Sequence, residues 1–149
     1  MEALEEIKSW LWIPKYWIAI YAGLLLVTMM IGESYYWSVY LIGIPLAIVP
    51  ITYRNLVGGG CSLRFQMCAL IKGMSAGIIF MVLTSAVDML VWSSLGVDLG
   101  WSPLTNMTYV SLIYQIWFLS GVIGGFGARI VEVRSYSDPE SSVTIAGFE

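Results

Sequence analysis

Four long apolar stretches, separated by polar connections, organise this chain. They cover about residues 17–32, 35–53, 73–92 and 109–128. An α-helix needs roughly 20 apolar residues to cross the hydrocarbon core of a bilayer. The pattern therefore predicts an all-α integral membrane protein with four transmembrane helices in two antiparallel hairpins. We expect residues 1–134 to form one domain, and residues 135–149, which are polar and rich in Ser, to form a mobile cytoplasmic tail.

The N-terminal residues show a different, amphipathic pattern. Leu4, Ile7 and Leu11 recur at helical spacing, while Glu side chains occupy other faces. Trp and Tyr residues cluster around Pro14, as is typical of the interface between membrane and water. We expect residues 2–13 to form a short interfacial helix, with Pro14 marking the turn into the first transmembrane helix.

Composition supports a membrane protein and argues against several kinds of chemistry. Hydrophobic residues make up 58% of the sequence and charged residues 11%, about half the charged fraction of a typical soluble domain. The sequence contains no His, the commonest general base and the usual ligand of zinc and haem. Cys61 and Cys68 match no common metal or redox spacing, and the glycines at 58–60 lack the Lys of a phosphate-binding loop. We therefore expect no cofactor, no metal site and no nucleic-acid partner.

Basic residues are confined to some parts of the chain. The seven Lys and Arg residues are Lys8, Lys15, Arg54, Arg64, Lys72, Arg129 and Arg134. All lie before the first stretch, in the middle connection or after the fourth stretch, whereas the other two connections carry only Glu33 and Asp98. Because cytoplasmic loops are enriched in Lys and Arg, we expect both termini on the cytoplasmic side of a cell membrane. An even number of transmembrane helices also places both termini on one side.

Small residues recur at helical spacing in the third and fourth stretches. They are Gly73, Gly77, Gly121, Gly124, Gly125 and Ala128. Small residues four apart let helix backbones approach closely in lipid. We expect a close antiparallel contact between the third and fourth helices near their cytoplasmic ends; the alternative is a contact with another subunit.

Asp88 is unusual because it is an acid within an apolar stretch. Helix rise places it about 12 Å from the outer end of that stretch. A charged carboxylate at the centre of a membrane helix costs at least about 2.5 kcal/mol. Gly77, Thr84 and Asp88 share one helix face, and Ser85 lies beside them. The outer half of each stretch contains no Lys or Arg, so the sequence offers no ion-pair partner.

Three arrangements would satisfy Asp88. It could be protonated and hydrogen-bonded to a polar group at similar depth, such as Gln115, Tyr109 or Tyr114. It could bind a proton or a cation as part of a transport pathway. It could instead pair with a basic residue of a different protein.

These features favour a non-catalytic function. A single intramembrane carboxylate without His lacks the grouped acids and bases of a membrane enzyme. Small size, glycine-rich helix faces and an unpaired acid predict an accessory or structural subunit of a larger membrane complex. Its partners would be the lipid bilayer and other membrane subunits. The alternative is a small homo-oligomeric transporter or channel that uses Asp88 to couple a proton or a cation.

Overall fold

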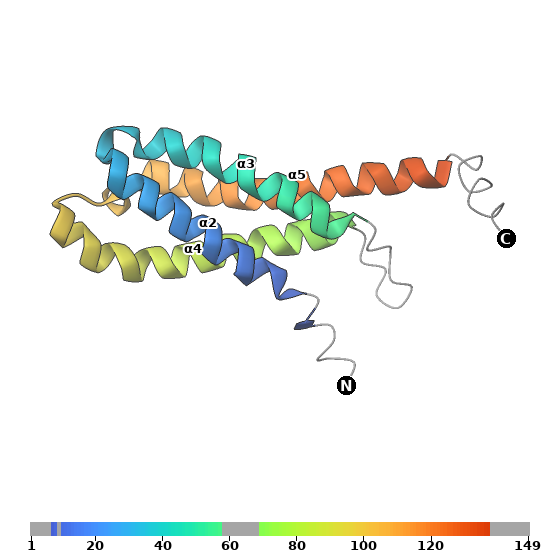
Figure 1. The fold of residues 1–149 in the computed structure, drawn as a ribbon, viewed down its shortest axis with the longest axis horizontal. Helices are drawn as coiled ribbons and strands as arrows, with labels where there is room; N and C mark the ends of the chain where they lie inside the picture. Colours follow the sequence, from blue (N-terminus) through green and yellow to red (C-terminus); the bar gives the residue numbers. More distant parts are fainter. Residues whose placement is uncertain (1–6, 9, 58–68, 138–149) are drawn as a thin grey trace.

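The structure, a computed structural model, describes residues 7–8, 10–57 and 69–137 (Figure 1). Its elements are α2 (Trp12–Ile31), η1 (Glu33–Tyr35), α3 (Tyr36–Leu56), α4 (Ala69–Leu99), η2 (Pro103–Thr105) and α5 (Met107–Ser137). The described residues contain no strand. The glycines at 58–60, both Cys residues and Arg64 lie outside the described residues, as do residues 1–6 and 138–149.

Each of the four long helices is apolar enough and long enough to cross a membrane. Each of them overlaps one of the four apolar stretches of the sequence. The prediction of an all-helical chain with four candidate membrane spans is therefore confirmed for the described residues.

The start of α2 differs from the sequence prediction. This helix begins at Trp12, and Pro14 lies inside its first turn, so Pro14 does not mark the turn that precedes the helix. Leu11 occupies that turn. Proline is tolerated in the first turn because the first N–H groups of a helix have no acceptor within the helix.

α4 and α5 are longer than the apolar stretches that predicted them. Each contains 31 residues. At the rise of an α-helix this is about 46 Å, compared with about 30 Å for a hydrocarbon core. Residues 95–99, expected to belong to a connection, complete α4 instead. The chain leaves α4 at Gly100, whose φ of +72° is a conformation that glycine adopts without strain. At the other end, α5 extends as far as Ser137, into the expected tail.

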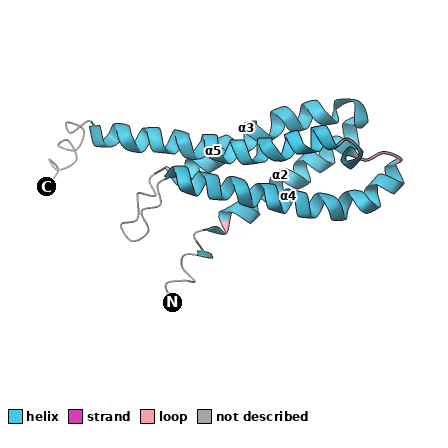
Figure 2. Ribbon diagram, turned by 180° about the vertical axis from the view of Figure 1, so that it is seen from behind, coloured by secondary structure: helices cyan, strands magenta, loops and turns pink. Residues whose placement is uncertain are grey.

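The long helices run back and forth along one axis (Figure 1). The connection between α2 and α3 and that between α4 and α5 lie at the same end of the bundle. α5 packs against both α3 and α4, and α2 lies against α3 and α4. Seen from behind in Figure 2, α5 extends beyond the other helices at its C-terminal end. The buried core between the helices includes Trp17, Ile44, Phe80 and Trp117.

α4 and α5 approach closely where glycines face each other. A Cβ atom on Gly73 would lie 2.6 Å from the Cα of Gly125, and one on Gly121 would lie 2.7 Å from the Cα of Gly77. Both distances are shorter than real Cβ atoms show, and the obstructing atoms belong to the backbone. Only hydrogen fits between the helices at these positions.

The remaining small residues of α5 contact other neighbours. A Cβ atom on Gly124 would lie 2.6 Å from the Cβ of Thr52 on α3. Ala128 is fully buried and packs with Leu56 of α3 and Ala69 of α4. All six of the small residues chosen from the sequence are therefore buried inside the chain's own bundle.

Candidate functional site

Asp88 lies on the buried face of α4. Thr84 precedes it by one turn and Trp92 follows it by one turn, so the three residues lie on the same side of the helix. Asp88 is 7% exposed, and Thr84 is fully buried. A carboxyl group in such surroundings requires hydrogen bonds from neighbouring helices.

Two tyrosines supply these hydrogen bonds. The Tyr21 hydroxyl of α2 donates to Oδ1 of Asp88 at 2.6 Å. The Tyr114 hydroxyl of α5 donates to Oδ2 at 3.2 Å. The first distance is typical of a strong bond from a hydroxyl to a carboxylate. Each oxygen of Asp88 is thus bonded to a different helix, so this one side chain connects α2, α4 and α5.

A second hydrogen bond joins α2 and α4 one turn away. The indole Nε1 of Trp17 donates to Oγ1 of Thr84 at 2.9 Å. The rings of Trp17 and Tyr21 stack with their centroids 5.1 Å apart. On both helices the bonded residues are four apart, so α2 and α4 run in parallel here and present matching polar faces. We call Trp17, Tyr21, Thr84, Asp88 and Tyr114 the polar centre.

Hydroxyl groups also link α2 to α3. The Tyr40 hydroxyl interacts with the side chains of Thr28 and Tyr36. Thr28 in turn donates its hydroxyl to the carbonyl oxygen of Leu24 at 2.8 Å. Polar side chains therefore hold α2 against both of its neighbours.

Aromatic rings cover the polar centre toward the short connections. The Tyr36 ring packs edge-on against Trp92 at 6.0 Å and against Trp101 at 5.6 Å. The Trp92 indole lies beside the Asp88 carboxyl, but among the described residues its N–H has no partner in hydrogen-bonding geometry. The Trp92 N–H is thus a buried donor without a partner next to the polar centre.

The structure places some of the residues selected from the sequence in the polar centre and others away from it. Thr84 and Tyr114 belong to the polar centre, and the half-buried Ser85 interacts with Tyr114. Gln115 is exposed on the outer side of α5, so the structure does not place it in the polar centre. Successive residues of a helix point about 100° apart, so only one of Tyr114 and Gln115 can face α4.

Tyr109 is also remote from Asp88. Its ring stacks on Trp37 with the centroids 4.7 Å apart, near the start of α5. Tyr109 therefore contributes to the contact between α3 and α5 and not to the polar centre.

The hydrogen-bond donors on α2 were not predicted from the sequence. Trp17, Tyr21 and Thr28 are all buried, and their spacing of four and seven residues places them on one face. Each combines an apolar body with a polar tip, in a helix whose other residues are mostly aliphatic. Three such residues on one helix face could have predicted a polar contact with another helix.

The charged and metal-ligating side chains of the described residues limit what the polar centre can do. Within the described residues, Asp88 has no ion-pair partner, whereas Arg129 and Glu132 pair at 3.3 Å near the far end of α5. No group of three His, Cys, Asp or Glu residues in this part of the chain could hold a metal ion. The centre can hold helices together and can exchange one proton at its carboxyl group.

Comparison with known proteins adds no assignment. The chain matches no family model, and no curated protein or solved structure is significantly similar to it.

Proposed function

We propose that the protein is a non-catalytic subunit of a larger integral membrane complex. The observation that carries this proposal is that both oxygens of Asp88 are bonded by tyrosines of the same chain. A carboxyl group used in this way fixes three helices relative to one another. Both carboxyl oxygens are then occupied by contacts between helices of the same chain.

The close packing of small residues belongs to the same proposal. The glycines of α4 and α5 allow the two backbones to touch, and Gly124 does the same between α5 and α3. Close contact of this kind stabilises helix association in lipid through van der Waals packing. Together with the polar centre, it would give a rigid bundle of the kind that scaffolds a neighbouring subunit.

The distribution of charge supports an orientation for the bundle. Among the described residues, the basic ones lie toward the end of the bundle that holds the start of α2 and the end of α5 (Figure 1). Glu33 and Asp98 lie toward the opposite end. We propose that the basic end is cytoplasmic, in accord with the enrichment of Lys and Arg in cytoplasmic segments.

The outer surface is available for contact with other subunits. Large apolar side chains project from the bundle, among them Leu46 of α3 at 74% exposed and Leu90 of α4 at 73% exposed. Since the small-residue faces and Asp88 are used internally, a partner would pack against these aliphatic surfaces.

Gentle detergent extraction from the native membrane, followed by sizing and mass spectrometry, tests this function. We expect a particle much larger than the 16.6 kDa chain, with partner proteins in fixed stoichiometry. A photo-crosslinking residue at Leu46 or Leu90 would then identify the face that touches the partner. A small particle that contains only this chain would refute the proposal.

A second candidate function is transport coupled to a proton or a cation in a homo-oligomer. The observation that favours it is the absence of an ion-pair partner for Asp88 among the described residues. An acid buried between membrane helices is a common element of proton pathways. Ion-dependent flux into liposomes that disappears in Asp88→Asn, with folding intact, would support this candidate over the first.

A further inference from the structure

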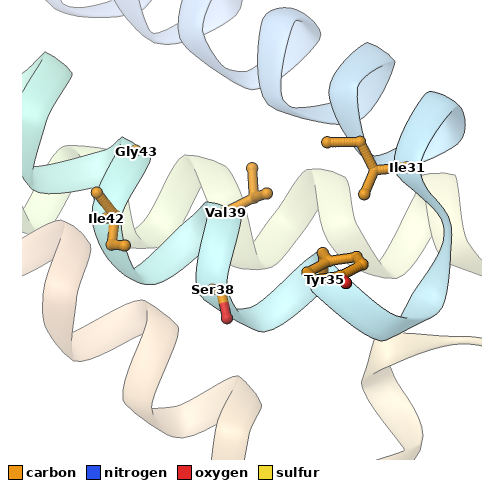
Figure 3. A pocket seen from close by; sticks show the side chains of 6 residues that line it. All are labelled: Ile31, Tyr35, Ser38, Val39, Ile42 and Gly43. Carbon is orange, nitrogen blue, oxygen red and sulfur yellow. The ribbon is translucent and has the colours of Figure 1, made fainter.

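A groove follows the outer surface of α3 next to the end of α2. It has a volume of about 520 Å³ and is lined by Ile31, Tyr35, Ser38, Val39, Ile42 and Gly43. Figure 3 shows Ile31 and Val39 between the two helices, Tyr35 at one end, and Ser38 and Ile42 along the other edge of α3. We call this feature the α2–α3 groove.

Small residues create the α2–α3 groove between larger ones. Gly43 and Ser38 are the small lining residues, whereas Tyr35 and Ile42 are larger and are 62% and 67% exposed. Apart from the two hydroxyl groups, the lining side chains are hydrocarbon. An apolar groove on a helix that can cross a membrane suits a hydrocarbon chain.

The dimensions also suit a lipid tail. A neighbouring groove on α3 is lined by residues from Leu41 to Pro50 and adjoins the first at Ile42, which lines both. The distance from Tyr35 to Pro45 is about 15 Å by helix rise, close to half of a hydrocarbon core about 30 Å thick. The α2–α3 groove and the start of its neighbour therefore match the depth of one leaflet.

The charges near the Tyr35 end of the groove favour one kind of lipid headgroup. Tyr35 ends the groove beside Glu33, which is exposed, and Asp98 is exposed at the same end of the bundle. The described basic residues all lie toward the opposite end. Unlike charges attract and like charges repel, so this end favours an ammonium group over a purely anionic headgroup.

We propose that the α2–α3 groove binds one hydrocarbon tail of a membrane lipid whose headgroup carries an ammonium group. The tail lies along α3 from Tyr35 toward Pro45, and the ammonium group lies beside Glu33. This site is distinct from the polar centre, and it does not depend on whether the protein is a complex subunit.

The test uses the full chain in nanodiscs that contain a trace of phosphatidylethanolamine with a photoreactive tail. Peptide mapping should find labels concentrated at the partly exposed Val39 and the exposed Ile42, over the exposed α4 positions Val82 and Leu90. Gly43→Leu fills the groove and should reduce this labelling about tenfold, the effect of losing about two buried methylene groups.

Gly23→Leu is the matched control. A Cβ atom at Gly23 meets no atom within 4 Å, whereas one at Gly43 meets only the flexible end of Leu24 at 3.0 Å. Both variants should fold, which thermal unfolding checks, and only Gly43→Leu should lose the label. Equal labelling of all exposed helix positions, or equal labelling of the two variants, would overturn the site.

The headgroup is tested by competition against the photoreactive lipid. Unlabelled phosphatidylethanolamine should compete better than phosphatidylglycerol, and Glu33→Gln should remove this preference while the label stays in the groove. Better competition by phosphatidylglycerol would overturn the assignment of an ammonium headgroup.

Discussion

Removing the hydrogen bond from Tyr21 to Asp88 is the most direct test of how α2 is held against α4. Tyr21→Phe deletes only the hydroxyl group and leaves the ring stacked on Trp17. Oδ1 of Asp88 then loses its donor in a buried position. We expect the free energy of unfolding to fall, with little change in the rest of the bundle.

The size of the effect follows from the geometry. A hydrogen bond to a charged group contributes about 1.5–3 kcal/mol, whereas those between membrane helices average about 0.6 kcal/mol with a maximum near 1.7 kcal/mol. The bond from Tyr21 is short at 2.6 Å and buried, so we expect about 1.5 kcal/mol. The bond from Tyr114 is 3.2 Å long and partly buried, so Tyr114→Phe should cost about 0.5 kcal/mol.

The assay is equilibrium unfolding in mixed micelles, arranged as a double-mutant cycle. Tyr21→Phe is measured alone and in an Asp88→Leu background, where the acceptor is absent. Tyr35→Phe serves as the control because Tyr35 is 62% exposed and its hydroxyl makes no contact with Asp88. If Tyr21→Phe costs no more than this control, or costs the same in the Asp88→Leu background, the proposed coupling of α2 to α4 is refuted.

Three further predictions concern other parts of the fold and use the same unfolding assay. Gly77→Ala should destabilise by about 1–3 kcal/mol, because the new Cβ would lie 2.5 Å from the carbonyl oxygen of Phe118, while Gly23→Ala should be neutral or stabilising. Gln115→Leu should leave stability unchanged or raise it, because Gln115 is exposed; a loss above about 1 kcal/mol would mean that it has a partner. Thr52→Val should stabilise by about 1 kcal/mol, because the Thr52 hydroxyl is buried without a partner in the described residues; destabilisation would show that this hydroxyl is bonded.

The long helices could be predicted because their signal is local. An α-helix satisfies its backbone hydrogen bonds within its own segment, so a long apolar stretch can be recognised as a helix from hydropathy alone. The ends were less predictable. Residues 95–99 contain Gly, Asp and Leu in a mixture typical of a loop, yet the helix continues until Gly100 takes a positive φ.

The partners of Asp88 were only partly predictable. Position along the fourth apolar stretch suggested Gln115 and Tyr114 equally, but this position says nothing about the direction in which a side chain points. The packing of α5 on α4 sets that direction, and it turns Tyr114 inward and Gln115 outward. Tyr21 lies 67 residues from Asp88 in the sequence, and its role depends on α2 lying beside α4.

The sequence by itself determined four apolar helices, the confinement of basic residues to particular segments and the presence of an acid that needs hydrogen bonds. These properties depend on composition and on spacing within one helix. The tertiary structure decided which helices touch, and so which glycines face a backbone and which hydroxyl groups reach Asp88. It also decided that the α2–α3 groove lies on the outer surface. Such contacts depend on the rotation of each helix about its own axis, which only packing against the other helices fixes.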